Sequence, residues 1–461
     1  MKKFILNISI PFLLQSCFVA KDYSRPEIEV QETYRTDQLP VDSLNMAQVS
    51  WRELFKDPYL QSYIEEGLEN NIDIRVALQQ INAAEAYVKQ GRAGYLPTFN
   101  LGLGITHQIL SRNSQFGRLF DGSITQYEST GNLSWEADIW GKLRSTDRAF
   151  QASYLQSVAA HQAVKTELIA ALASTYYQIL ALDEQLKITK ETVATRENSL
   201  EITEALKEAG NVTQVGVKQT EAQLYNAQAI VVSLENQIRL LENAFSILLG
   251  DAPHNIERNE LDLQKPVTEL QTGVPAELLS NRPDVIAAEY NLRNAFELTN
   301  VARSNFYPSL SLTASTGFQS LELAELFNVN SLFANLAASI VQPVINRRQI
   351  RTEYEVSQAR QETALLEFQR SLLIASREVS DALYNFEAAE ETIEIKNNEF
   401  QAYNQAMSDS EELLNYGYAN YLEVLTAREN TLNSQLELVN ARFNRLNAVV
   451  ELYQALGGGW E

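Results

Sequence analysis

Two stretches of the chain, roughly residues 145–207 and 349–416, contain neither proline nor glycine. Because the residues that most strongly break helices are missing, each stretch is predicted to form one continuous helix. At ~1.5 Å per residue, these helices would be roughly 90 to 100 Å long, about three times the width of a small domain. They are too long to fold back into one globular core, so the chain must pack them lengthwise against other helices.

The segment that follows each long stretch has the apolar spacing of a coiled coil. Apolar residues step by four and three in turn, which is a 3.5-residue period and predicts left-handed coiled-coil packing. They are Val231, Leu234, Ile238, Leu241, Phe245 and Leu248 in one segment, and Leu432, Leu436, Val439, Phe443, Leu446, Val450 and Tyr453 in the other. These return helices, about 214–249 and 420–456, would cover only ~55 Å each. We expect residues 57–93 and 276–304 to form helices that stack end to end with the return helices, so that together they match the length of the long helices.

The chain also contains an internal two-fold repeat. The stretch "AGYLPTFNLGLGIT" at 93–106 corresponds to "SNFYPSLSLTASTG" at 304–317, with an offset of 211 positions. Residues matched by the repeat include Pro97 with Pro308, Gly210 with Gly417, and Gly250 with Gly457. We therefore expect a first repeat at 57–250, a proline-containing connector at 251–275 and a second repeat at 276–461. Each repeat is predicted to hold helices and two strands.

Polar and apolar residues alternate in the predicted strands. The apolar face comprises Phe99, Leu101 and Leu103 in the first strand, Trp135 in the second, and Leu310 and Leu312 in the third, with a fourth strand near 332–344. In the second strand Glu136 and Asp138 lie on the opposite face. A half-buried sheet on a soluble core would alternate in the same way. The long helices leave no helix to cover the apolar face, however, which favours lipid. A sheet in hydrocarbon must close, which four strands cannot do and twelve strands from three chains can.

The N-terminus has the layout of a secretory signal. In "MKKFILNISIPFLLQSC" two lysines precede an apolar run that is too short to span a bilayer. The only cysteine of the chain, Cys17, ends this stretch, in a sequence similar to a bacterial lipobox. We expect a signal peptide at 1–16, lipidation of Cys17 and an extended arm at 17–56. A single cysteine cannot form a disulfide within the chain, so packing alone must hold the mature protein.

Charge and motif content exclude two broad classes of function. The formal net charge of −22 argues against a nucleic-acid partner and is consistent either with a merely solubilising surface or with one that favours cations. The three histidines, His107, His161 and His254, lie far apart in unrelated sequence contexts, and neither HExxH nor GxSxG occurs. We therefore expect no enzyme activity, no metal site and no cofactor.

Several motifs together resemble one family. The motifs "WEADIWGKLR", "RPDV", "SNFYPSLSLTASTG", "YGYANYLEVLTA" and "LGGGW" are similar to those of the outer membrane factor family of efflux and secretion systems, the TolC and OprM type. The stretches "CFVAKDYSRP" and "WRELFKDPYL" resemble its lipoprotein branch. The resemblance implies an α+β membrane protein, a homotrimer with a long α-helical coiled-coil barrel in the periplasm and a 12-stranded β-barrel in the outer membrane, with four strands from each chain.

The resemblance further implies a passive exit duct. Its partners would be a periplasmic adaptor protein, an inner-membrane pump of the RND type and outer membrane lipid. The family exports drugs, metals, siderophores and proteins, and the sequence does not select among these substrates. A non-pore periplasmic scaffold lipoprotein built from coiled coils is the alternative, although it leaves the apolar faces of the strands uncovered.

The resemblance also assigns roles to residues near the helix turns. Leu422 matches a position that narrows the closed tunnel, but Thr426 stands where an acid is expected, so Glu423 or Glu429 would supply the carboxylate. The turns would meet the adaptor through Gly210, Asn211, Val212, Gly417, Tyr418 and Ala419. A second departure is Asn346-Arg347-Arg348, which replaces a glycine-bearing turn between strand and helix.

Overall fold

The computed structural model describes residues 19–27, 49–115, 117–118, 123–264 and 278–460. The predicted signal peptide at 1–16 and Cys17 lie outside the described residues, as do parts of the predicted arm and connector. The chain divides into two compact units. One contains the described residues of 1–27, 81–157 and 288–368, and the other those of 28–80, 158–287 and 369–461.

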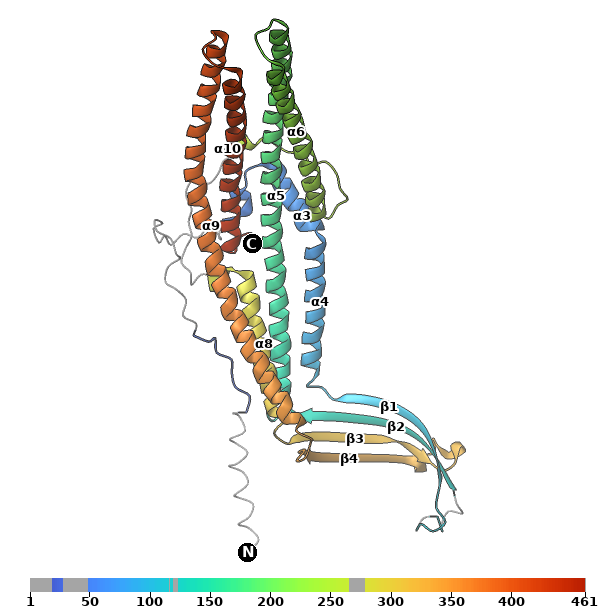
Figure 1. Ribbon diagram of the computed structural model, residues 1–461. Coiled ribbons are helices and arrows are strands. Elements are labelled where there is room, and N and C mark those ends of the chain that lie inside the picture. The colour runs from blue at the N-terminus through green and yellow to red at the C-terminus, as the bar shows by residue number, and fades with distance from the viewer. Residues whose placement is uncertain (1–18, 28–48, 116, 119–122, 265–277, 461) are drawn as a thin grey trace. The chain divides into compact units, whose positions relative to one another are not determined.

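The elements follow the order predicted from the repeat, with two strands and a set of helices in each half (Figure 1). The helices are α2 Trp51–Leu54, α3 Pro58–Asn70, α4 Ile72–Ala93, α5 Lys142–Glu208, α6 Gln214–Leu249, α7 Leu278–Asn281, α8 Pro283–Ser304, α9 Gln349–Asn415 and α10 Tyr421–Ala455. The strands are β1 Thr98–Ile109, β2 Ser123–Ala137, β3 Ser309–Ser320 and β4 Leu332–Val341. Short 3-10 helices occur at Leu261–Leu263, Leu323–Glu325 and Val329–Ser331. The two long helices, α5 and α9, are each 67 residues long, as the absence of Pro and Gly predicts.

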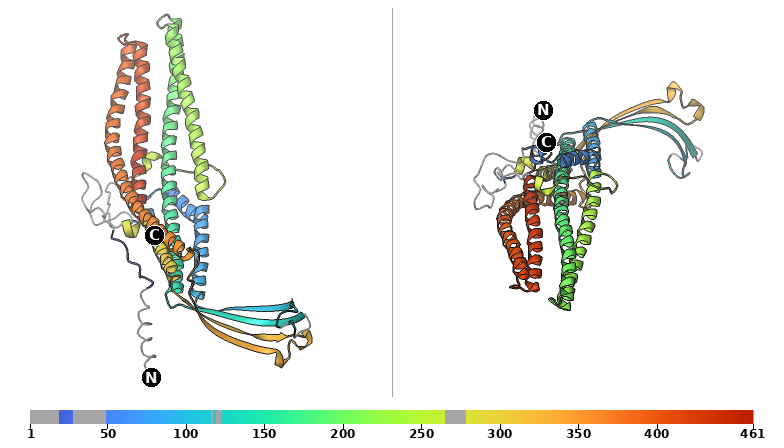
Figure 2. Two further views of the ribbon diagram at one scale, coloured as in Figure 1. Left: turned by 60° about the horizontal axis from the view of Figure 1, so that its bottom comes forward. Right: turned by 90° about the horizontal axis from the view of Figure 1, so that it is seen from above.

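The first unit contains one four-stranded antiparallel sheet of order β1-β2-β3-β4. The strands are long and curve together as one ribbon (Figure 2). Only the inner strands β2 and β3 are paired on both sides, so β1 and β4 each present an edge that is unpaired within the described chain. Among the described helices, none combines the length and apolar character needed to cross a membrane.

The register places the alternating residues on two distinct faces of this sheet. One row across the four strands, on the apolar face, consists of Phe99, Leu133, Ala314 and Leu336. The neighbouring row on the other face runs through Asn100, Asn132, Ser315 and Asn335. On the apolar face, Leu101 and Leu103 are each 81% exposed. The sheet therefore has a polar face and an apolar face that this chain leaves open.

Short linkers join these strands to the helices of the same unit. Pro97 and Pro308 directly precede β1 and β3, where a fixed φ and the missing N–H end helical pairing. The alternating pattern extended the second strand through Asp138 to Trp140, but β2 ends at Ala137. The Asp138 carboxylate instead accepts hydrogen bonds from the backbone N–H groups of Leu143 (2.9 Å) and Arg144 (3.0 Å). This residue therefore caps the start of α5 rather than lining the polar face of the sheet.

The second unit contains two helical hairpins, formed by α6 with the part of α5 from Val158 onward and by α10 with the part of α9 from Gln369 onward (Figures 1 and 2). Its core is rich in aromatic side chains. Tyr176 of α5 and Phe245 of α6 are fully buried, and Tyr453 of α10 is nearly so. Phe55 packs between Tyr177 and Tyr453, with ring centroids 6.4 and 6.1 Å apart. This core ties the segment after α2 to both hairpins.

The return helices end against the short helices at equivalent points of the two repeats. Gly250 ends α6 with φ 86°, and a Cβ there would lie 2.6 Å from the carbonyl oxygen of Asn70. Gly457 follows α10 with the same φ, and its Cβ would lie 2.5 Å from the carbonyl oxygen of Asn281. Both positions require the left-handed backbone and the close approach that only glycine allows. The stacking of short helices beyond the return helices is thus the same in both halves.

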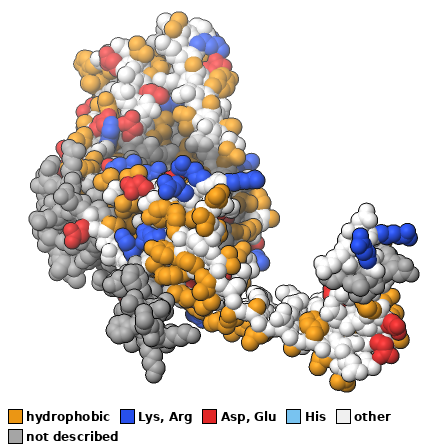
Figure 3. Space-filling model, turned by 90° about the horizontal axis from the view of Figure 1, so that it is seen from below, with side chains coloured by type: hydrophobic (Ala, Val, Ile, Leu, Met, Phe, Trp, Pro, Cys, Tyr) orange, Lys and Arg blue, Asp and Glu red, His pale blue; other side chains and the backbone are white. Residues whose placement is uncertain are grey.

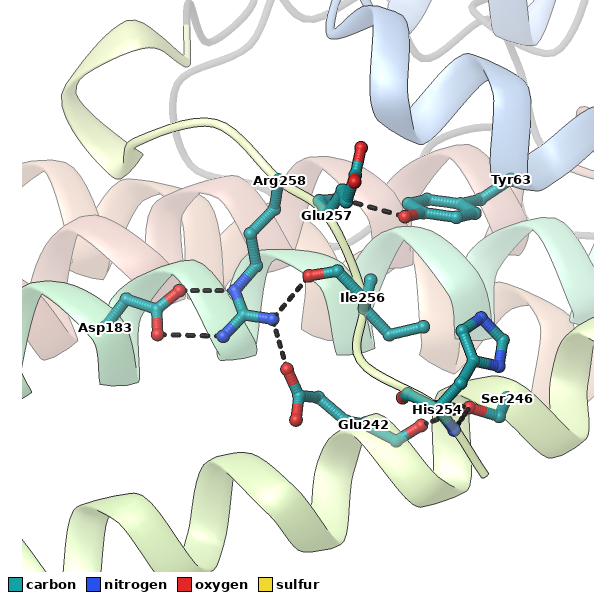
Figure 4. A network of polar contacts seen from close by, with 8 residues as sticks. All are labelled: Tyr63, Asp183, Glu242, Ser246, His254, Ile256, Glu257 and Arg258. Carbon is teal, nitrogen blue, oxygen red and sulfur yellow. Dashed lines mark hydrogen bonds and ion pairs between the residues drawn. The ribbon is translucent and has the colours of Figure 1, made fainter. Parts of the chain in front are cut away.

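Part of the connector is fixed to the first hairpin by one arginine (Figure 4). The Arg258 guanidinium binds the Asp183 carboxylate of α5, with Nη2 to Oδ1 at 3.0 Å, and the Glu242 carboxylate of α6, with Nη1 to Oε1 at 2.5 Å. Nη1 also donates to the carbonyl of Ile256 at 2.7 Å. Tyr63 of α3 donates to the carbonyl of Glu257 at 3.0 Å. The described connector residues are therefore held by specific contacts to α3, α5 and α6.

Candidate functional site

The two helix turns that the sequence analysis singled out have the same backbone form. Gly210 has φ 80° and Gly417 has φ 77°, and a Cβ at either position would meet nothing within 4 Å. The N–H of Asn211 donates to the carbonyl of Leu206, and the N–H of Tyr418 donates to that of Leu413, both at 2.9 Å. These are the closing hydrogen bonds of helix C-caps in which glycine takes the left-handed position.

The turns present apolar side chains at their exposed ends. Tyr418 is 82% exposed, Asn211 is exposed, and Val212 and Ala419 are half-buried. Two further exposed apolar residues, Tyr416 and Val215, flank the two turns and were not predicted from the sequence. Both lie close to the glycines in sequence, so the turn signal could have included them. The two turns therefore expose both polar and large apolar side chains.

Glu423 is engaged in the start of α10. The Asn420 side chain accepts a hydrogen bond from the N–H of Glu423 at 3.0 Å. In turn, the Glu423 carboxylate accepts one from the N–H of Asn420 at 3.4 Å. This reciprocal pair is a capping box. Leu422, one residue earlier, is 56% exposed, and Thr426 donates to the carbonyl of Leu422 at 2.9 Å. Of the predicted constriction residues, Leu422 therefore has an exposed apolar side chain, and Glu423 is the third helical residue of the capping box whose N-cap is Asn420.

Glu429 belongs to a polar network that joins the two hairpins. Its carboxylate Oε2 accepts from Nη2 of Arg196 in α5 at 2.7 Å. The Arg196 side chain is only 3% exposed, and its Nη1 also donates to the carbonyl of Gln223 in α6 at 2.5 Å. Arg196 thus binds its own hairpin and the neighbouring one at the same time.

A tyrosine and a second arginine complete this network. The Tyr421 hydroxyl lies 2.8 Å from the Thr203 hydroxyl of α5 and 2.8 Å from the Thr220 hydroxyl of α6. Nε of Arg428 donates to Glu411 of α9 at 2.7 Å, and its Nη1 contacts the Ser199 hydroxyl of α5. We call Arg196, Thr203, Tyr421, Arg428 and Glu429 the inter-hairpin network. Sequence reasoning found only the last of these.

A cleft lies beside the inter-hairpin network. Its volume is about 800 Å³, and both turns contribute to it. The lining includes Thr203, Asn211, Val212, Gly417, Tyr421 and Arg428. The hairpins therefore leave a space between them near the turns, and the inter-hairpin network connects them beside it.

The predicted strand residues lie elsewhere, in the first unit. Phe99, Leu101 and Leu103 of β1 are exposed on the apolar face, and Trp135, Leu310 and Leu312 of β2 and β3 are half-buried on the same face. Trp135 lies opposite Leu312, and its indole N–H donates to the carbonyl of Tyr95 at 2.9 Å. Cys17 is outside the described residues.

Histidine and acidic side chains are the groups that could form a metal site in the described part of the chain. No group of three or more His, Cys, Asp or Glu side chains among the described residues could hold a metal ion. His107 contacts the Thr125 hydroxyl at 2.8 Å and His254 contacts the carbonyl of Ala252 at 3.0 Å. Burial, with a smaller contribution from Lys165, lowers the pKa of His161, which favours its neutral form.

Comparison with known proteins gives a consistent result. The family model described as "Outer membrane efflux protein" matches residues 63–251 and again 274–458. The chain is 30% identical to the probable efflux pump outer membrane protein SepC of Pseudomonas putida, over 100% of this chain and 98% of SepC. It is 28% identical to the probable outer membrane lipoprotein SilC of Salmonella typhimurium, over 99% of this chain and 98% of SilC.

The fold matches solved channels as well. The open-state outer membrane channel MtrE of Neisseria gonorrhoeae superposes with a TM-score of 0.84 at 26% identity, covering 96% of this chain and 98% of MtrE. The double match of the family model also agrees with the internal repeat of the sequence. The chain belongs to the outer membrane efflux protein family, a non-enzymatic family of outer membrane channels.

Proposed function

We propose that three copies of this chain form a passive exit duct across the outer membrane and the periplasm. Strands β1 to β4 of each copy would close into a 12-stranded barrel, and the helices would form a tunnel in the periplasm. An inner-membrane pump of the RND type would deliver substrate through a periplasmic adaptor protein. Lipidated Cys17 would add a second attachment to the membrane.

The observation that carries this proposal is the open four-stranded sheet. Its strands have 12, 15, 12 and 10 residues, and a tilted membrane strand needs about 9 to 11. The apolar face is exposed along β1, and both sheet edges are unpaired within the described chain. In hydrocarbon each unpaired backbone group costs several kcal/mol, so such a sheet is stable in lipid only when its edges meet other strands. Edges from neighbouring copies supply these strands.

The alternative, a scaffold lipoprotein without a pore, can be separated from this proposal by extraction. Replacing Cys17 with Ala removes the acylation site. A scaffold held only by its lipid should then leave the membrane in carbonate buffer without detergent. The proposed barrel should stay in the membrane fraction and need detergent for release, and recovery of the Cys17→Ala variant in the soluble fraction would refute it.

The helix turns support a role as the adjustable inner end of the duct. Leu422 is exposed near the turn and would narrow the closed tunnel. Glu429 would act with Arg196 to hold the α9–α10 hairpin against α5 and α6. Opening would be a separation of the two hairpins at their turns, in which the inter-hairpin network breaks while the aromatic core remains. The adaptor would drive it by binding the exposed turn residues, including Gly210, Asn211, Val212, Gly417, Tyr418 and Ala419.

A further inference from the structure

The points where helices meet strands have a charge opposite to that of the whole chain. Over residues 89–97, 138–148, 298–308 and 342–352, the sequence holds nine Lys or Arg side chains and only two acidic ones, Asp138 and Asp147. The chain as a whole carries a net charge of −22. All four segments belong to the first unit. Cations are therefore concentrated around the ends of the strands.

Some of these cations already have partners, and others do not. Lys142 pairs with Glu136 at 3.0 Å, and Arg348 pairs with Glu355 at 2.9 Å. Four arginines are exposed and form no ion pair with any side chain in the part of the chain that the structure describes. They are Arg92, Arg144, Arg347 and Arg351. We call these four residues the junction arginines.

Each linker that joins a helix to a strand also exposes large apolar side chains. They include Leu96 before β1, Ile139 after β2, Tyr307 before β3, and Val344 and Ile345 after β4. The last two are 89% and 93% exposed. Figure 3, in which the molecule is seen from below, shows Lys and Arg side chains gathered in a band next to hydrophobic ones. Apolar groups beside cations are typical of the boundary between hydrocarbon and headgroups, where arginine places its stem in the apolar layer and its charge at the surface.

The backbone between β4 and α9 gives independent evidence that arginine has a role there beyond forming the turn. Arg347 has φ 53° and Arg348 has φ 68°, in the left-handed region that L side chains with a Cβ disfavour. In the described chain they are the only residues other than glycine with positive φ. Glycine would make this turn without strain. Strained positions of this kind gather at functional sites.

We propose that the junction arginines bind the phosphates of anionic phospholipid headgroups in the periplasmic leaflet of the outer membrane. Guanidinium groups form paired hydrogen bonds with phosphate oxygens, and the exposed apolar residues of the linkers enter the adjoining acyl layer. This contact fixes the depth of the strands in the bilayer. The inference rests on the membrane-spanning role of β1 to β4 proposed above, and it adds the class of lipid that the protein recognises.

The test measures lipid retained by the full-length protein purified in a non-ionic detergent. The protein is incubated with equal amounts of phosphatidylglycerol and phosphatidylethanolamine, and native mass spectrometry counts the molecules of each that stay bound. We expect the wild type to prefer phosphatidylglycerol by roughly fivefold or more. A variant with Gln in place of the junction arginines should lose this preference. A control variant with Gln in place of the exposed helical cations Arg75, Lys187, Arg239 and Arg370 should keep it.

A second variant covers the case in which four substitutions disturb assembly. Arg347→Gly removes one charge and the left-handed strain at that residue, so we expect a higher melting temperature and weaker retention of phosphatidylglycerol. Equal retention of both lipids by the wild type would overturn the proposal, as would an unchanged preference in Arg347→Gly and in the four-fold variant. A wild type that fails to insert into vesicles of either lipid would instead refute the membrane barrel, which separates the two failures.

Discussion

The contact between Arg196 and Glu429 offers the sharpest test of the opening mechanism. The Arg196 side chain is 3% exposed and the Glu429 side chain is 30% exposed, with Nη2 and Oε2 2.7 Å apart. Glu429→Gln leaves a buried guanidinium without its anion. Breaking a fully buried pair costs about 3 to 5 kcal/mol, and the access of water to Glu429 reduces this to about 2 kcal/mol. This cost falls on any state in which the two hairpins are in contact.

If the hairpins separate on opening, the cost of the unpaired Arg196 raises the free energy of the closed state relative to the open state. A difference of about 2 kcal/mol changes the ratio of open to closed channels by roughly 30-fold in favour of the open form. Single-channel recording in planar bilayers measures this ratio directly. Replacing Arg196 with Met in the Glu429→Gln background removes the unpaired charge, so the double variant should return part of the way towards the closed state.

A matched control lies on the same helix. Glu437 of α10 pairs with Lys396 of α9 at 2.5 Å, but both belong to one hairpin and both side chains are partly exposed. Glu437→Gln should leave the open fraction unchanged, because an exposed pair contributes at most about 1 kcal/mol and does not join the hairpins. An open fraction of Glu429→Gln equal to that of the wild type, or an equal increase in the open fraction of Glu437→Gln, would contradict this mechanism.

Three further predictions concern other parts of the chain. Leu422→Ser should raise single-channel conductance because a smaller polar group widens the constriction; unchanged conductance would remove Leu422 from it. Cysteines at Val212 or Tyr418 should crosslink to the adaptor in cells, and consistent failure at both would contradict the assignment of the turns. Gly457→Ala should lower the melting temperature more than Gly417→Ala. Both substitutions place alanine in the left-handed region, which costs about 1 to 2 kcal/mol of stability. Only at Gly457 does the new Cβ also meet a backbone oxygen, that of Asn281 at 2.5 Å. Equal melting temperatures would show that the helix ends tolerate the extra atom.

The architecture follows closely from local sequence signals. The long helices were predictable because neither proline nor glycine interrupts 145–207 or 349–416. Helix α5 runs slightly beyond these limits, from Lys142 to Glu208, and α9 lies within them, from Gln349 to Asn415. The two faces of the sheet follow from strict alternation, since a period of two fixes which residues share a face. The second strand was the exception, because alternation extended it through Asp138 to Trp140 whereas β2 ends at Ala137. A carboxylate just before a helix serves as a cap, and alternation alone does not distinguish the two roles.

The inter-hairpin network could not be predicted in the same way. Tyr421 meets a threonine 218 positions away, and Arg196 meets a glutamate 233 positions away. Within its own helix, a charged residue such as Arg196 has the spacing of an ordinary solvated side chain. Its burial depends on how the two hairpins pack, and no local pattern encodes that. The sequence did indicate an unusual turn at Arg347, but the left-handed backbone there became visible only in the structure.

The claim that three open sheets close into one barrel is tested most directly at the sheet edges. Within one chain, β1 and β4 are separated by two strands, so facing residues lie roughly 14 Å apart, too far for a disulfide. Cysteines at Phe99, Leu101 or Leu103 in β1, combined with one at Leu336 in β4, are oxidised in intact outer membranes. We predict covalent species that end at three copies of the mature chain. Monomers for every pair, or a series that continues beyond three copies, would contradict the barrel.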